Sequence, residues 1–126
     1  MYEGCTRNAY HLWMYRYQKE HFAELPRARF LKALAAEGFQ CNPGYGRLNK
    51  EAFITDTLRS RSYQRLFPSE TLAQWEERTA CPANDKVSEV AAWFPQATLL
   101  GPRADMDQLA EAIRKIQKHA GELARA

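Results

Sequence analysis

The stretch Tyr10–Tyr17 constrains the fold of this chain more than any other feature. Its apolar residues do not alternate cleanly with polar ones, as they would in a strand that has one face in water. In an extended strand these side chains divide between two faces, with Leu12 and Met14 on one and Trp13, Tyr15 and Tyr17 on the other. We therefore expect the strand to be covered on both faces, by the chain's own helices on one and by a separate partner on the aromatic one.

Length and composition limit the class of protein. The 126 residues suffice for one modest core. Apolar residues make up 45% and charged residues 26%, which is ordinary for a soluble globular protein. The net charge of +3 comes from mixed signs, whereas a nucleic-acid partner would call for a concentrated basic face. No apolar stretch is long enough to span a membrane and no leader pattern opens the chain, so we expect no membrane partner.

The cysteines indicate the cellular compartment. Cys5, Cys41 and Cys81 are odd in number and widely spaced, which fits neither a disulfide framework nor a paired-cysteine zinc site. We expect each of them to be a packed small hydrophobe in a reduced, cytoplasmic protein.

Two helices and one short strand are predicted with clear boundaries. "LPRARFLKALAAEGFQC" predicts a helix with Pro26 in its first turn, a left-handed stop at Gly38, and an apolar stripe of Phe30, Leu31 and Leu34. A brief strand at Phe39–Cys41 should end in the turn "NPGYG". The last helix should be capped by Asp105, with Gln108 completing a capping box, and bury a stripe of Met106, Leu109, Ala110, Ile113, Ile116 and Ala120.

The middle of the chain is less regular. We interpret residues 48–79 as a surface excursion with short helices around Ile54–Arg65 and Ser69–Glu77. A further helix should begin at a cap on Asn84 and end before Pro95, with Val87, Val90 and Ala91 on one face and Trp93 and Phe94 extended. The order of elements predicts one α+β domain over 1–126, with a small antiparallel or mixed sheet and helices on one face.

Motifs for catalysis are missing from this pattern. Gly44 and Gly46 lack the third glycine of a phosphate loop, and the three histidines have no metal-ligand spacing, so we expect no metal site. His11 is either a structural histidine or a ligand contact. The tyrosine of "NPGYG", Tyr45, is either packed in its turn or presented to a ligand.

The order of several short motifs resembles a known family. These are "RNAYHLWMYRY", "RARFLKALAAEGFQCNPGY" and "CPANDKVSEVAAWFPQATLLGPRADMDQLAEAIRKIQ". Together they are similar to the C-terminal part of DegT/StrS-type aminotransferases, which are pyridoxal-phosphate enzymes that transaminate nucleotide-linked keto-sugars or cyclitols. The chain departs from the family where Gly46 and Arg47 follow Tyr45, in place of a proline-containing step, and residues 53–79 form a longer stretch than in many members.

The resemblance implies the small domain of a two-domain enzyme. The large domain, which would carry pyridoxal 5'-phosphate and its lysine, has no counterpart in this sequence, so no residue here is expected to be catalytic or to bind the cofactor. His11 and Tyr45 are the implied substrate contacts, and Arg7 and Asn8 are weaker ones. The implied partners are the large domain and a second copy in a homodimer.

A different class of function remains open. The chain could instead be a stand-alone binding or assembly module that has kept the fold and uses an exposed aromatic face for association.

Overall fold

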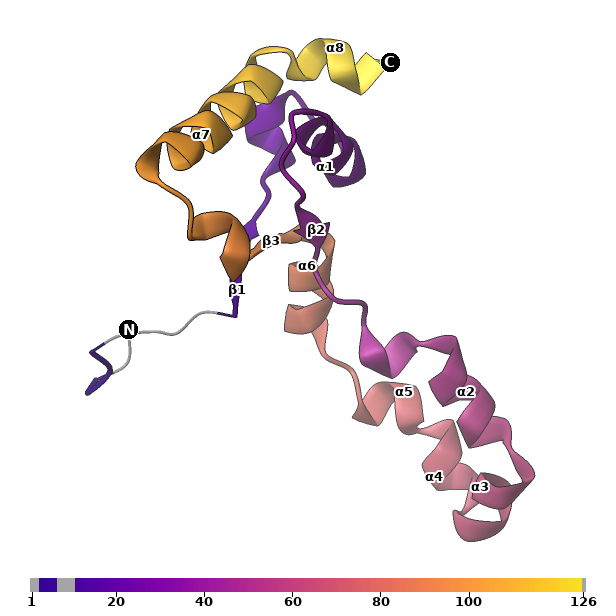
Figure 1. The fold of residues 1–126 in the computed structure, drawn as a ribbon. Helices are drawn as coiled ribbons and strands as arrows, with labels where there is room; N and C mark the ends of the chain where they lie inside the picture. The colour runs from indigo at the N-terminus through magenta and orange to yellow at the C-terminus, as the bar shows by residue number, and fades with distance from the viewer. Residues whose placement is uncertain (1–2, 7–10, 126) are drawn as a thin grey trace. The chain divides into compact units, whose positions relative to one another are not determined.

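The computed structural model describes residues 3–6 and 11–125, which form two compact units (Figure 1). The sheet unit comprises the described residues of 1–44 and 90–126, and the helical unit comprises Tyr45–Glu89. The stretch expected as a surface excursion, 48–79, lies inside the helical unit. The α+β class with an antiparallel sheet is confirmed. Among the described residues, no helix combines the length and the apolar character needed to cross a membrane.

Three short strands form the sheet in the order β1-β3-β2. They are β1 (Leu12–Arg16), β2 (Asn42–Pro43) and β3 (Ala91–Pro95), and both pairings are antiparallel. The expected strand at Phe39–Cys41 is wrong, because pairing begins only at Asn42, directly after that stretch, and includes the proline that was assigned to the turn. Pro43 is tolerated there because β2 is an edge strand, where a missing N–H breaks no second ladder.

The aromatic face of β1 packs on the core of its own unit. Tyr17 is buried, and the rings of Trp13 and Tyr15 both stack on Phe94 of β3, with centroids 6.1 Å and 5.7 Å away. Trp13 nevertheless keeps 43% of its surface exposed, so cover of this face by a separate partner stays a prediction. The residue left more open is Met14, on the opposite face, with 48% of its surface exposed. Because the strand is apolar on both faces, its sequence could not show which face the helices would cover.

Helices α1 (Arg27–Ala36) and α7 (Arg103–Lys118) supply the apolar cover of the sheet unit. The predicted α1 stop is confirmed, since Gly38 has φ of 95° and its N–H donates to the carbonyl of Ala35. The core cluster includes Leu25, Phe30, Leu34, Leu109, Ala112 and Ile116, with Ile113 partly buried beside it. The two apolar stripes thus meet, as their periodicity predicted.

The predicted cap of the last helix is wrong. α7 begins at Arg103 with Pro102 as the capping residue, which makes no side-chain cap, and Asp105 lies in the first turn. A β-carbon on Gly101 would come within 2.5 Å of the Asp105 carboxylate, so this glycine leaves room for that side chain. The helix also ends earlier than its apolar pattern, at Lys118, and α8 (Ala120–Arg125) follows.

Short turns of 3₁₀ helix join these elements. They are η1 (Lys19–Phe22) before α1 and η3 (Gln96–Leu99) between β3 and α7. After η1, Ala23 and Glu24 both adopt positive φ, at 49° and 60°. Such backbone is unfavourable for residues with a β-carbon, so this loop is held by its surroundings.

The helical unit consists of η2 (Leu48–Lys50), α2 (Ala52–Arg59), α3 (Arg61–Leu66), α4 (Ser69–Ala73), α5 (Trp75–Arg78) and most of α6 (Pro82–Val90). Each of the two helices expected here is broken in two. The first breaks at Ser60, whose extended ψ of 150° interrupts the helix and whose hydroxyl caps α3 by accepting from the Tyr63 N–H. The second breaks at Gln74.

The start and end of α6 also differ from the prediction. It begins at Pro82, a residue that suits a first helical position, rather than after a cap on Asn84. Ala91 does not belong to the helix, because it opens β3 and is buried there. The extended backbone expected for Trp93 and Phe94 is confirmed.

Candidate functional site

His11 lies directly before β1, in the sheet unit, and its side chain is exposed. Its backbone carbonyl accepts a hydrogen bond from the Gln96 N–H at 3.2 Å, which ties the entry of β1 to η3. The exposed side chain is not packed in the core, and both alternatives that the sequence left open, a structural histidine and a ligand contact, stay untested. An exposed imidazole on a fixed backbone can reach a ligand from this position.

Tyr45 is the first residue of the helical unit and is 67% exposed. The packed tyrosine that the sequence left open is therefore wrong. The backbone just before it is fixed, because the Gly44 N–H donates to the Ala91 carbonyl at 3.0 Å. A β-carbon on Gly44 would come within 2.6 Å of the Ala91 β-carbon, so only glycine allows this close approach.

The other two expected contacts, Arg7 and Asn8, lie outside the described residues. His11 and Tyr45 belong to different units, and each is described within its own unit. The four-residue substrate site therefore stays a prediction. What the structure adds is that the two described members are exposed rather than packed.

Cys41 is the one expected small hydrophobe that is buried. Its thiol lies 3.0 Å from the Tyr15 hydroxyl, and burial raises the pKa of both groups above their ordinary values. A thiol with a raised pKa is a poor nucleophile, which supports a packing role. Cys81 is exposed, so the expectation of packing is wrong for that residue.

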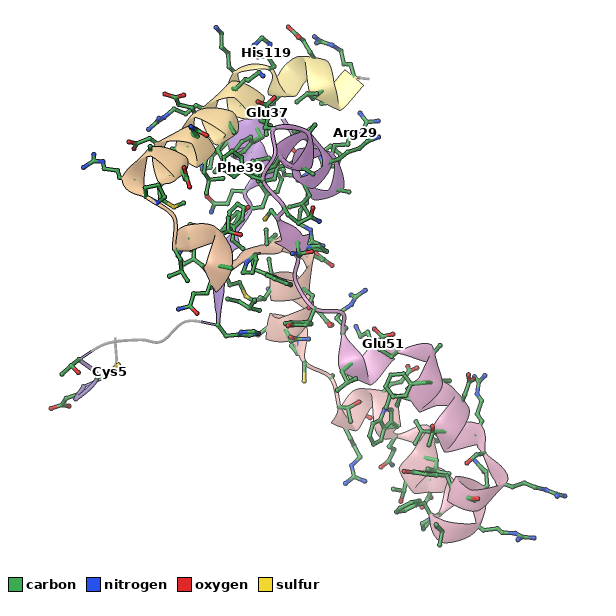
Figure 2. The ribbon with its side chains drawn as sticks, in the orientation of Figure 1. Cys5, Arg29, Glu37, Phe39, Glu51 and His119 are labelled. Atoms are coloured by element: carbon green, nitrogen blue, oxygen red, sulfur yellow. The ribbon has the colours of Figure 1, made fainter. Side chains whose placement is uncertain are left out.

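All six lysines lie among the described residues and all are exposed. Three of them form ion pairs: Lys19 with Glu24 at 2.6 Å, Lys50 with Asp85 at 2.7 Å, and Lys115 with Glu37 at 2.8 Å. Figure 2 shows Glu37 at the end of α1, beside α7. Donation to Glu24 raises the pKa of Lys19, which is opposite to the lowered pKa of a Schiff-base lysine. No lysine here fits the setting that pyridoxal phosphate needs.

A groove in the helical unit was missed by the sequence analysis. It has a volume of about 820 Å³, and its wall includes Lys50, Arg59, Trp75, Glu76 and Asp85. These residues come from η2, α2, α5 and α6, and short broken helices give no periodicity from which such a wall could be read. Within the described part of the chain, no group of three or more His, Cys, Asp or Glu residues could hold a metal ion.

The chain is similar to curated aminotransferases over most of its length. One from Streptoalloteichus tenebrarius, named for L-glutamine and 3-amino-2,3-dideoxy-scyllo-inosose, is 29% identical over 126 residues, covering 94% of this chain and 29% of the relative. An L-glutamine:2-deoxy-scyllo-inosose aminotransferase of Streptomyces kanamyceticus is 35% identical over 106 residues, covering 81% and 24%. The L-glutamine:scyllo-inosose aminotransferase of Streptomyces griseus is 30% identical over 132 residues, covering 97% and 28%.

The resemblance to sugar and cyclitol aminotransferases is thus confirmed, and it concerns a part of those proteins. The chain spans between 24% and 29% of the length of these relatives. No protein-family model matches it, and no solved structure matches it.

Proposed function

We propose that residues 1–126 form the small, C-terminal domain of a DegT/StrS-type aminotransferase that acts on a keto-sugar, with a keto-cyclitol of the inosose class as the substrate. The observation that carries this proposal is the similarity to several inosose aminotransferases over 81% to 97% of the chain. Their names also favour L-glutamine as the amino donor.

In such an enzyme pyridoxal 5'-phosphate carries the amino group from the donor to the ketone. The lysines of this chain are exposed, so the cofactor would be held by another part of the polypeptide. The role of this domain is then to form a wall of the substrate cleft. It is not catalytic by itself.

His11 and Tyr45 are the proposed substrate contacts, and Arg7 and Asn8 are proposed as weaker ones. The exposure of the first two supports this role, since a side chain that must meet a ligand cannot be committed to the core. Imidazole and phenol groups both donate and accept hydrogen bonds, which suits the hydroxyl groups of a cyclitol.

The proposed partners are the large domain of the same enzyme and a second copy in a cytoplasmic homodimer. The alternative is a stand-alone binding or assembly module. It draws its support from the exposed apolar side chains of the helical unit, which include Leu48, Phe53, Leu66 and Phe67.

The test begins with the gene. We expect the reading frame upstream of Met1 to continue into a segment that carries the cofactor lysine, and the complete product to transfer the amino group of L-glutamine to scyllo-inosose. The 126-residue chain alone should show no lysine that borohydride fixes to pyridoxal phosphate. The proposal is contradicted if a stop codon closes the reading frame directly upstream of Met1. It is also contradicted if borohydride fixes pyridoxal phosphate to a lysine of the isolated 126-residue chain.

The residue assignments are tested in the complete product. His11→Ala and Tyr45→Phe should raise KM for the cyclitol about tenfold, as expected when one or two hydrogen bonds to substrate are lost. The matched control is His119→Ala, an exposed histidine between α7 and α8 (Figure 2), which should leave KM unchanged. Equal KM values in all variants would remove His11 and Tyr45 from the site.

A further inference from the structure

The outer edge of β1 is an unprotected edge of the three-stranded sheet. Within the described residues, β3 is the one strand that pairs with β1. The sequence of β1 includes no proline and no lysine, and its pairing with β3 runs without a bulge. Proteins commonly protect a sheet edge by such devices, because its unpaired N–H and C=O groups are a template for another strand. The opposite edge is protected, since β2 has only two residues and one of them is Pro43.

The register of β1 shows which of its backbone groups face outward. At its two ends, the His11 carbonyl and the Tyr17 N–H form hydrogen bonds to residues that flank β3, at 3.2 Å and 2.7 Å. Hydrogen-bonded positions alternate along an antiparallel pair, so every second residue points its N–H and C=O groups away from the partner strand. These residues are Leu12, Met14 and Arg16. Within the described chain, no hydrogen bond from a turn, a loop or a side chain reaches their backbone groups.

The side chains around this edge leave it accessible. Met14, the central residue of β1, is 48% exposed, and its neighbour Trp13 is 43% exposed. On the other face from Met14, the rings of Trp13 and Tyr15 lie 5.3 Å apart and both stack on Phe94. A strand added at this edge would therefore extend an aromatic strip on one face and contact Met14 on the other.

We propose that β1 pairs with β1 of a second copy of this chain, antiparallel and with Met14 opposite Met14. This register places Leu12 opposite Arg16 at both ends, so all three outward residues of each copy form hydrogen-bonded pairs, with about six bonds in all. A shift by two residues in either direction loses one of the three pairs. On the aromatic face, Trp13 comes opposite Tyr15 of the other copy in the close, non-hydrogen-bonded positions, where aromatic pairs stabilise a sheet.

Charge and symmetry favour a second copy as the occupant of this edge. Arg16 is the only charged residue of β1, and in this register it faces Leu12 rather than another arginine, so like charges do not meet. Both copies use the same surface, as a two-fold axis requires, and the axis passes beside Met14. The second copy also adds cover to the exposed part of Trp13. This pairing is a property of the 126-residue chain and does not depend on the aminotransferase assignment.

Sedimentation velocity of the whole 126-residue chain, from about 1 to about 300 μM, tests the association. We expect a reversible monomer–dimer equilibrium with a Kd on the order of 10 μM, because so short a strand pair buries little surface. Met14→Lys places two like charges at the two-fold axis and should weaken the dimer about tenfold or more. Leu66→Lys is the matched control, since it makes the same kind of change at a residue of the helical unit that is 72% exposed, and it should leave the Kd unchanged. Far-UV circular dichroism confirms that both variants fold.

Cross-linking tests the register and needs no added charge. The background is Cys5→Ser with Cys81→Ser, which replaces the two cysteines that are not buried. The α-carbons of two Met14→Cys copies would lie about 5.5 Å apart, so dibromobimane, a short reagent that joins neighbouring thiols, should give a covalent dimer. Arg16→Cys is the matched control, because its two copies would lie about four residues, or roughly 13 Å, apart along the strands. A mixture of Leu12→Cys and Arg16→Cys should cross-link as mixed dimers.

Three outcomes would overturn the proposal. The chain could stay monomeric up to about 300 μM, about 30-fold above the expected Kd. The dimer could survive Met14→Lys and be lost in Leu66→Lys, which would place the contact on the helical unit. Arg16→Cys could cross-link as readily as Met14→Cys, which would exclude the proposed register. Each of these results leaves transamination by the complete enzyme untouched, and an inactive complete enzyme would leave the strand pairing untouched.

Discussion

The two units of this chain use their apolar residues differently. The sheet unit buries a connected core in which Leu25, Phe30, Leu34 and Phe94 are at most 1% exposed. In the helical unit, Tyr45–Glu89, every residue keeps at least intermediate exposure. A connected core gives the sheet unit its own source of stability, whereas the helical unit relies on local hydrogen bonds and partial contacts.

The distribution of exposed apolar side chains makes the same point. Of the ten large hydrophobic residues that are exposed in the described part of the chain, seven belong to the helical unit: Tyr45, Leu48, Phe53, Tyr63, Leu66, Phe67 and Val87. Short helices cannot each bury a full stripe, because a stripe needs several turns to form. The helical unit is therefore the region where a ligand or another protein surface adds most to stability.

The largest expected effect contrasts one phenylalanine in each unit. Phe30→Ala should lower the free energy of unfolding by about 3–5 kcal/mol, because Phe30 is 1% exposed and its loss leaves a cavity. Phe67→Ala removes the same atoms from a side chain that is 45% exposed and should cost less than about 1 kcal/mol. Urea unfolding followed by circular dichroism measures both. Equal losses would mean that the helical unit has a core of its own.

Native-state hydrogen exchange gives the second contrast. Amides of α1 and α7 should exchange through global unfolding, while amides of α2–α5 should open locally and exchange about 100-fold faster or more. The reason is that the latter helices have four to eight residues and no buried face. Uniform protection across both units would contradict the comparison.

The sequence predicted the sheet unit better than the helical unit, for a physical reason. Stripes such as Phe30 and Leu34 with Leu109 and Ile116 repeat over several turns, so helical periodicity identifies them and they indeed meet in the core. In the helical unit the ends of the helices depend on the backbone angles of single residues such as Ser60, and no periodic pattern in the sequence predicts those angles. Helix propensity alone therefore predicted that those helices continue through Ser60 and Gln74.

Two features of the sheet unit could not be predicted from the sequence, for a different reason. β1 has apolar residues on both faces, so its sequence could not show that Tyr17 would turn inward and Met14 outward. The pairing of Asn42 with Trp93 depends on contacts distant in sequence. For the candidate site, the sequence supplied His11 and Tyr45 only through family resemblance, and the groove around Trp75 had no sequence signal.

A third test uses pH to probe the sheet unit. Burial, followed by the charges of Glu20 and Glu24, raises the pKa of Tyr17 to about 12, against about 10 in the unfolded chain. The neutral phenol is thus favoured by folding, so its contribution is complete below pH 10 and is lost as the pH rises toward 12. Wild-type stability should fall over this interval.

Tyr17→Phe isolates that contribution. The variant should lose about 1 kcal/mol at pH 7, because the Tyr17 hydroxyl donates to the Leu25 carbonyl at 2.8 Å, and should then fall less steeply above pH 10. Tyr63→Phe, in the helical unit, is the matched control and should follow the wild type. Parallel pH curves for all three proteins would show that Tyr17 does not couple folding to pH.

A fourth test concerns the strained loop before α1. Ala23→Gly should raise stability by about 0.5–1 kcal/mol, because glycine adopts the observed φ of 49° without strain and that gain exceeds its entropy cost. Ala28→Gly, at an exposed position inside α1, should instead lower stability by about 1 kcal/mol. Thermal unfolding of the pair gives the sign of each effect. Destabilisation by both would show that Ala23 carries no backbone strain.

The smallest expected effect is at the surface of the sheet unit, where Lys115 of α7 contacts both carboxylate oxygens of Glu37, at 2.8 Å and 3.0 Å. The lysine side chain is 63% exposed, so solvent screens the pair and its coupling should be about 0.2–1 kcal/mol. A double-mutant cycle with Lys115→Ala and Glu37→Ala measures it, and about 1 M salt should reduce it.

The Lys50–Asp85 pair of the helical unit is the matched cycle, since the carboxylate is 24% exposed there and the lysine 50%. A larger coupling in that pair would locate rigid structure around the groove, because an ion pair gains most where its side chains are already held in place. A coupling near zero in both pairs would leave core burial as the sole difference in stability between the two units.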